Sequence, residues 1–470
     1  MLARSDLYSY QNHAVDFIKS KRNCALWVDM GLGKTVSTLT AFNDLKESFD
    51  ARKMLVIAPK RVARKVWSDE VRSWKHLSHL RVSRIVGSAK ECFEALKADA
   101  DVYTIGRDRV AWLHAQFIQD GKQVVEWPFD TVVLDESQSF ASQSSGRWKA
   151  IADLRLKTRF TRLIELSGTP MPNGYLKLWS QLWLLDRGNR LGASERWMKE
   201  RWFTPPVGMF AKWNIKPNAA REIQAKLRDI VLVMREEDYL DLPPVVDNFI
   251  RCELSSAALK TYKQMETQFI AEVAGKKLTA VNAGVLDGKL LQLANGAVYH
   301  EGKNWVPFHD AKLEALEETL EGIAGKALIC VNFKHDTVRV GALLDRHCKE
   351  QNRTWRLLDS DRDFAEWAAG QIDIGVLHPA SAGHGLNDVY KAGAEDMAWF
   401  GLTNNWEWYA QARARLTGGH RRAGRNIRIH HIVADGTRDD DYVRLIKRKE
   451  LDEDNLMASL AVKIGHRRAA

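Results

Sequence analysis

The chain of 470 residues carries 70 Lys and Arg against 60 Asp and Glu, so its formal net charge is +10. This basic balance favours a polyanionic partner, and the length predicts two or three domains. No apolar run approaches the roughly 20 residues that cross a bilayer, and the N-terminus lacks the apolar core of a signal peptide. We therefore expect an intracellular protein without a membrane partner. The five scattered cysteines form no CxxC pair, which excludes the common zinc layouts and predicts reduced, buried thiols.

Short apolar runs alternate with longer helical patterns along the whole chain. The predicted strands of the first half are Ala25–Val28, Met54–Ala58, Thr131–Leu134 and Leu163–Leu166. Those of the second half are Ala327–Val331, Ile372–Leu377, Met397–Phe400 and Ile427–Val433. These runs are continuous rather than alternating, as is typical of parallel strands that are covered on both faces. The pattern predicts two doubly wound α/β lobes in tandem.

A domain boundary is expected at Pro243-Pro244, because a proline pair ends regular structure and stiffens a connection. The predicted domains are therefore 1–242 and 243–470. Residues 175–235 have a Trp-rich helical pattern without a strong strand, and residues 255–300 also have a helical pattern. We interpret both as short helical additions to the lobes.

The clearest local motif is DMGLGKT at residues 29–35, between an apolar strand and the helical run Val36–Phe42. Glycines such as Gly31 and Gly33 let the backbone N–H groups face a phosphate at the start of a helix. Lys34 neutralises phosphate charge in such a loop, and the hydroxyl of Thr35 is a magnesium ligand. The first glycine of the general pattern is replaced by Val28. The alternative interpretation is a glycine-rich turn with a surface lysine.

Two further strands end in polar residues. Thr131–Leu134 is followed by Asp135 and Glu136. A carboxylate at a strand end holds magnesium, and a neighbouring glutamate orients and deprotonates the attacking water. Leu163–Leu166 is followed by the turn Ser167–Pro170. Because the order along the chain matches that of a phosphate-transfer site, we expect these residues beside the Gly-Lys-Thr loop.

Basic residues cluster in three stretches. Residues 60–90 contain nine Lys or Arg against two acids, and residues 190–228 contain nine against three. The third is an arginine-rich stretch that includes Gln411, Arg413, Arg415, Arg421 and Arg422. An arginine from a second lobe stabilises charge on a transferring phosphoryl group, whereas the alternative is a surface basic patch.

Taken together, these motifs resemble the superfamily-two helicases, and within them the Swi/Snf-like DNA translocases, in their compact phage and prokaryotic form. Residues 7–11 resemble the adenine-reading element, with Gln11 as its glutamine, and residues 29–35 are similar to the family's own phosphate loop, which also lacks the first glycine. Residues 56–59 with the following Trp67 and Trp74 resemble the first DNA-contact element. Residues 135–138 occupy the DExx position, where the family usually has His in place of Gln138. The segment from residue 234 to Pro244 resembles the junction between lobes.

The second half continues the resemblance in order. Residues 327–333 resemble the opening strand of the second lobe, and residues 381–387 resemble the fifth motif. Trp406, Gln411 and Arg415 resemble the approach to the sixth motif. Its second arginine is displaced by Gly418-Gly419, so Arg421 or Arg422 is expected in that role, and we favour Arg421.

The resemblance implies two RecA-like lobes that hydrolyse ATP with Mg²⁺ in the cleft between them and move on DNA, without reading its sequence. The residues implied for catalysis are Lys34, Asp135, Glu136, Arg415 and Arg421. Those implied for binding nucleotide are Gln11, Gly31, Gly33, Lys34, Thr35 and Gln138, with Thr35 and Asp135 as metal ligands. Those implied for nucleic-acid contact and coupling are Lys60, Arg61, Ser167, Thr169, Ser381, Gly383 and Gln411.

We expect movement on duplex DNA by a DNA-stimulated ATPase. The alternatives are a strand-separating DNA or RNA helicase and, from another class, an ATP-gated DNA clamp with little turnover. The chain is expected to be a monomer, in the host cytoplasm if it is phage-encoded. Replication or recombination proteins are its expected protein partners.

Overall fold

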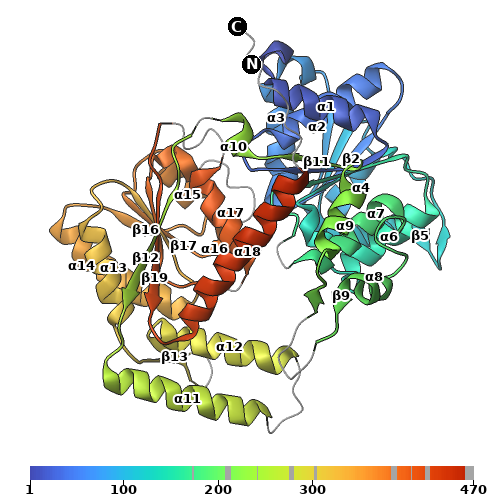
Figure 1. Ribbon diagram of the computed structural model, residues 1–470. Coiled ribbons are helices and arrows are strands. Elements are labelled where there is room, and N and C mark those ends of the chain that lie inside the picture. Colours follow the sequence, from blue (N-terminus) through green and yellow to red (C-terminus); the bar gives the residue numbers. More distant parts are fainter. Residues whose placement is uncertain are drawn as a thin grey trace. The chain divides into compact units, whose positions relative to one another are not determined.

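The computed structural model describes residues 1–171, 174–206, 213–240, 242–274, 280–300, 304–382, 389–403, 405–418 and 424–460. The chain packs as two units (Figure 1). Unit 1 runs from Met1 to residue 241 and resumes at Lys449, and unit 2 is Leu242–Arg448.

Unit 1 is built on a seven-stranded sheet in the order β11-β1-β8-β7-β2-β4-β3. Every neighbouring pair in this sheet is parallel. Its strands are β1 (Asn23–Val28), β2 (Met54–Ala58), β3 (Val82–Ile85), β4 (Val102–Gly106), β7 (Thr131–Asp135), β8 (Arg162–Ser167) and β11 (Val231–Met234). The carboxyl ends of parallel strands lie at one edge of a sheet, so the residues that follow β1, β2, β7 and β8 share that edge.

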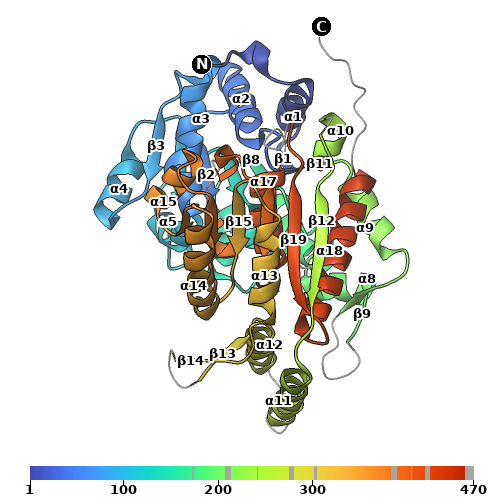
Figure 2. The same ribbon diagram turned by 90° about the vertical axis from the view of Figure 1, so that its left-hand side faces the viewer.

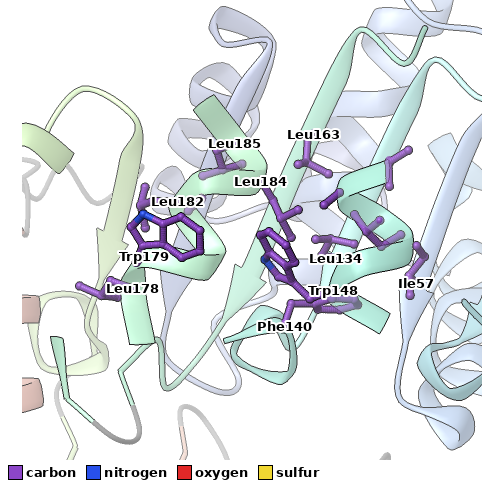
Figure 3. Packing of buried hydrophobic residues seen from close by; sticks show 14 of the residues in the cluster. Ile57, Leu134, Phe140, Trp148, Leu163, Leu178, Trp179, Leu182, Leu184 and Leu185 are labelled. Atoms are coloured by element: carbon purple, nitrogen blue, oxygen red, sulfur yellow. The ribbon is translucent and has the colours of Figure 1, made fainter. Parts of the chain in front are cut away.

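Helices cover both faces of this sheet. One face packs against α1 (Ser9–Ser20), α2 (Lys34–Glu47) and α3 (Trp67–Ser73). The other packs against α4 (Ala89–Lys97), α5 (Val110–Phe117), α6 (Gly146–Lys157) and α7 (Leu178–Asp186). Figure 3 shows this second core, where Trp148 of α6 and the leucines of α7 lie over Leu134 and Leu163 of the sheet. Burial on both faces explains why the inner strands are largely apolar, whereas the edge strand β3 exposes Arg84.

The segment that we expected to be wholly helical, residues 175–235, also supplies a strand. It contains α7, α8 (Glu195–Trp202), α9 (Ala219–Leu227) and the two-stranded β9–β10 sheet (Phe203–Thr204 and Asn214–Ile215). It ends in β11, which pairs in parallel with β1. The prediction of no strong strand here is therefore wrong, because four buried residues suffice for an edge strand that pairs with β1. Two short elements, β5 (Ile118–Gln119) and β6 (Lys122–Gln123), form a separate hairpin, and α10 (Glu236–Tyr239) follows β11.

Unit 2 has a six-stranded parallel sheet in the order β12-β19-β18-β15-β17-β16. Its strands are β12 (Val246–Cys252), β15 (Ala327–Cys330), β16 (Trp355–Leu357), β17 (Ile374–Leu377), β18 (Asp396–Trp399) and β19 (Arg428–Ala434). One face packs against α13 (Ala311–Glu321) and α14 (Lys334–Glu350), which lie in front of β15 and β19 in Figure 2. The other packs against α15 (Asp361–Ala368), α17 (Trp406–Thr417) and α18 (Arg438–Leu460).

The helical pattern at residues 255–300 corresponds to α11 (Ser256–Ala274) and α12 (Ala280–Ala294). A short antiparallel pair, β13 (Ala297–Tyr299) and β14 (Trp305–Pro307), follows them. Lys312 of α13 is fully buried, where it pairs with Asp439 at 2.5 Å and donates to Asn295 at 2.9 Å. A buried charge needs such partners, and these tie α13 to α18 and to the end of α12.

The expected fold class, two doubly wound parallel-sheet lobes with helical additions, is confirmed. One boundary differs from the expected domains, because the chain from Lys449 groups with unit 1 rather than with the second lobe. The reason is that Leu456, Met457 and Leu460 pack into the same core as α6 and α7. Among the described residues, no helix is long and apolar enough to span a membrane.

Candidate nucleotide site

The Gly-Lys-Thr loop connects β1 to α2 as the sequence predicts. Gly31 and Gly33 have φ of 95° and 86°, a left-handed conformation that favours glycine. Lys34 is the first residue of α2, and its ammonium donates to the carbonyl oxygens of Val28 and Asp29. The N-terminus of α2 and the side chain of Lys34 thus lie at the carboxyl edge of the sheet, an arrangement suited to phosphate.

Gln11 lies against this loop. Its side-chain Nε2 donates to the carbonyl of Leu32 at 3.3 Å, and its Oε1 accepts from the backbone N–H of Tyr8 at 3.0 Å. A Cβ added at Gly33 would lie 2.2 Å from Gln11 Nε2, so glycine is needed there for space as well as for its φ. The packing places Gln11 next to the expected phosphate site, whereas its role in reading adenine stays a prediction.

The carboxylates of Asp135 and Glu136 follow β7. Asp135 is buried, and burial with the neighbouring charge of Glu136 raises the pKa of its carboxyl to about 6. The charge of Lys34 and a hydrogen bond from Trp67 act in the opposite direction on this pKa. Glu136 has φ of 54°, which turns the chain sharply after the strand. The charges of Glu136 and Lys34 therefore both act on the carboxyl of Asp135, which places the three residues in one site.

A chain of hydrogen bonds joins the end of β7 to the end of β8. Gln138 Nε2 donates to Glu136 Oε2 at 2.7 Å, and Ser167 Oγ donates to Gln138 Oε1 at 2.8 Å. The backbone N–H of Thr169 in turn donates to Ser167 Oγ at 3.1 Å. A Cβ added at Gly168 would lie 3.5 Å from Lys34 Nζ. The Ser-Gly-Thr turn is thus linked to the expected catalytic carboxylate through Gln138 and lies close to Lys34 of the phosphate loop.

Sequence reasoning missed one tie to this loop. The backbone N–H of Asp29 donates to the carbonyl of Met234 at 3.0 Å, and that of Glu236 donates to Asp29 Oδ2 at 2.9 Å. Burial raises the pKa of the Asp29 carboxyl to about 6. The segment after β11 therefore holds the first residue of the loop. The contact between Asp29 and Glu236 follows from the pairing of β11 with β1, so a prediction of that strand pair would have revealed it.

The site residues expected in unit 2 are described only in part. Gln411 and Arg415 are both buried on α17, and Gln411 Nε2 donates to Glu407 at 3.3 Å. Ser381 belongs to the short helix α16 (Pro379–Ala382). The positions Gly383, Arg421 and Arg422 lie outside the described residues. The roles of these residues stay predictions.

The basic stretches differ in whether their cations form ion pairs with acidic residues. Lys60, Arg64 and Lys65 are exposed just after β2, and none of the three forms an ion pair within the described residues. Arg61, at the same turn, is half-buried. In residues 190–228, by contrast, many cations are paired with acids of unit 1. These pairs are Arg190–Asp229, Arg196–Glu200, Lys199–Glu195 and Arg201–Glu222.

The oxygen ligands at this edge suit magnesium. Mg²⁺ prefers hard oxygen donors, and Thr35 and Asp135 supply a hydroxyl and a carboxylate. The hydroxyl of Thr169 is buried at the same edge and has no partner among the described residues. No cluster of three or more His, Cys, Asp or Glu able to hold another metal occurs in the described part of the chain, and all five cysteines are buried and free. The residues present therefore fit a magnesium-bound phosphate group.

A parallel α/β unit with a Gly-Lys-Thr loop, paired carboxylates and a Ser-Gly-Thr turn at one edge defines the class of phosphate-loop ATPases. The SNF2-related domain matches residues 10–295 of the chain. The p41 protein of Acyrthosiphon pisum secondary endosymbiont phage 1 is 35% identical over 465 residues, which cover 96% of each chain. The chain belongs to the SNF2-related family.

More distant relatives are much longer proteins. Helicase ssl-1 of Caenorhabditis elegans is 25% identical over 54% of this chain and 10% of its own length. The chromatin-remodeling ATPase INO80 of Candida albicans is 24% identical over 51% of this chain and 17% of its own length. Among solved structures, the Sulfolobus solfataricus SWI2/SNF2 ATPase core in complex with dsDNA is 21% identical, covers 97% of this chain and 94% of that one, and has a TM-score of 0.43.

Proposed function

We propose that this protein is a DNA-stimulated ATPase that moves along duplex DNA. The observation that carries the proposal is the convergence of Lys34, Asp135 and Glu136 at the edge of the unit 1 sheet where β2 also ends. The exposed cations Lys60, Arg64 and Lys65 follow β2 directly. A site for phosphate transfer and a surface for a polyanion therefore arise from neighbouring strands of one sheet.

In the proposed reaction, the backbone N–H groups of the loop and Lys34 bind the phosphates of ATP. Thr35 and Asp135 hold magnesium, which neutralises phosphate charge when it is bound. Glu136 accepts the proton of the attacking water and is oriented by the amide of Gln138. Arg415 and Arg421 of unit 2 are proposed to stabilise charge on the transferring phosphoryl group.

Duplex DNA is proposed as the track because the family includes relatives named as chromatin-remodeling ATPases. Contact through Lys and Arg with phosphates is independent of sequence and weakens with salt. A strand-separating helicase is the second candidate, because another relative is named a helicase. The ATP-gated clamp is the third and is disfavoured by the presence of Glu136 beside Asp135.

The test compares ATP hydrolysis and two displacement assays. Translocation on intact duplex removes a third strand from a triplex without opening the duplex, whereas a helicase releases one strand of a fork. The proposal expects duplex-stimulated phosphate release with triplex displacement and no unwinding. Unwinding of forked DNA would favour the second candidate, and ATP binding without phosphate release would favour the clamp.

A further inference from the structure

The chain after β2 contains a π-helical turn. Val62–Val66 is π-helical and continues directly into α3. Such turns are rare and occur often at functional sites, because they change which side chains face inward. Here Ala63 and Trp67 are buried, whereas Arg64 and Lys65 are exposed. The turn therefore presents cations to solvent on one side and an indole to the interior on the other.

A hydrogen bond from β4 holds this turn. Thr104 of β4 donates from its hydroxyl to the carbonyl oxygen of Ala63 at 2.7 Å, and both residues are fully buried. A buried carbonyl needs a partner, so this bond stabilises the irregular turn. This bond joins the turn that precedes Trp67 to the sheet.

The indole of Trp67 reaches the candidate metal ligand. Its Nε1–H donates to Asp135 Oδ2 at 3.0 Å, and the ring is fully buried. An indole is a donor only, so the bond fixes the orientation of one carboxylate oxygen and leaves the other for a different partner. Groups that orient metal ligands in this way alter metal affinity when they are removed.

We propose that Trp67 is a positioning residue for the magnesium-binding carboxylate of Asp135, and that the turn Val62–Val66 links phosphate contact at Lys60, Arg64 and Lys65 to that carboxylate. This inference rests on the proposed function, since it assigns Asp135 to magnesium and the turn to DNA. It makes Trp67 part of the coupling between DNA and ATP hydrolysis rather than a core residue alone.

The test is Trp67→Phe, which keeps an aromatic ring and removes the N–H. The matched control is Trp202→Phe, since Trp202 is also buried and donates from its indole to the carboxylate of Glu222 at 2.9 Å, away from the site. We expect Trp67→Phe to raise the Mg²⁺ concentration for half-maximal ATP hydrolysis by about tenfold. The stimulation by duplex DNA falls, the affinity for DNA is unchanged, and Trp202→Phe changes none of these quantities.

A purely structural role predicts that both variants lower the melting temperature and leave the Mg²⁺ dependence unchanged, which overturns the inference. If Trp67→Phe does not fold, Thr104→Val removes the bond to Ala63 with little change of shape, and a smaller shift in the same Mg²⁺ dependence is expected. An unchanged Mg²⁺ dependence in Thr104→Val then overturns it. Lys34→Ala separates the two proposals. If Lys34→Ala retains ATPase activity, the proposed function fails. If Lys34→Ala loses ATPase activity and Trp67→Phe has the Mg²⁺ dependence of the wild type, only this inference is rejected.

Discussion

The side-chain amide of Gln138 donates a 2.7 Å hydrogen bond to the carboxylate of Glu136 and accepts one from the hydroxyl of Ser167 at 2.8 Å. Gln138 therefore stands between the expected general base and the turn after β8. An amide does not titrate, so Gln138 itself neither gains nor loses a proton in this link.

Gln138→Ala is expected to lower the turnover number for ATP with little change in the Michaelis constant, because it removes the group that orients Glu136 and leaves the phosphate-binding residues Lys34 and Thr35 in place. The expected loss is about tenfold, on the scale of one hydrogen bond to a charged group. Steady-state kinetics measure it. Gln143→Ala is the control, since Gln143 bonds Glu195 on the exposed surface. Equal kinetics for the two variants would reject the positioning role of Gln138.

Glu136→Gln should bind ATP normally and hydrolyse it at least about 100-fold more slowly, because it removes a general base without altering size. Binding of a fluorescent ATP analogue and phosphate release separate the two effects. A loss of nucleotide binding would show that Glu136 has a different role.

DNA binding is expected to depend on Lys60, Arg64 and Lys65 more than on the paired cations of residues 190–228. Replacing the three by alanine should reduce the slope of log affinity against log salt by up to about 0.9 for each phosphate that the protein no longer neutralises. The control replaces Arg196, Lys199 and Arg201, which are paired with acids. Filter binding or anisotropy at several salt concentrations measures the slopes, and a larger effect in the control would reverse the assignment.

Glu165 should make the stability of the protein depend on pH. It is fully buried on β8, and burial with the nearby charge of Asp186 raises the pKa of its carboxyl well above the ordinary 4.5. A group whose pKa is raised on folding contributes its full stability below the unfolded pKa and loses it as the pH rises toward the folded value.

Glu165→Gln should therefore be more stable than the wild type above pH 4.5. The difference should grow by up to about 1.4 kcal/mol per pH unit until the pH reaches the folded pKa. Urea unfolding between pH 5 and 8 measures it, and Glu94→Gln on the exposed surface is the control. Parallel stability curves for Glu165→Gln and the wild type would mean that Glu165 is ionised in the folded protein.

All eight strands expected from the sequence form, because strands buried on both faces leave an unmistakable apolar run. Several strands were missed, including the fully buried β4 and β11. β12 is partly exposed along most of its length, and β16 has only three residues. The strand β11 lies directly after helices and was hidden by their pattern.

The loop, the two carboxylates and the Ser-Gly-Thr turn were also predictable, since each follows a strand that ends at the same edge. The sequence pattern does not show which side chains form hydrogen bonds across the sheet. Trp67 is separated from Asp135 by 68 residues, and its helical spacing indicates only that it is buried. The tie between Asp29 and Glu236 spans 207 residues and depends on the pairing of β11.

Phosphate release from wild type and Lys34→Ala, with and without duplex DNA, shows whether the edge of the unit 1 sheet hydrolyses ATP in response to DNA. Lys46→Ala, at the other end of the same helix, is the control. We expect hydrolysis that duplex DNA stimulates in the wild type and in Lys46→Ala, and a fall of at least about 100-fold in Lys34→Ala. Full DNA-stimulated activity in Lys34→Ala would contradict this expectation.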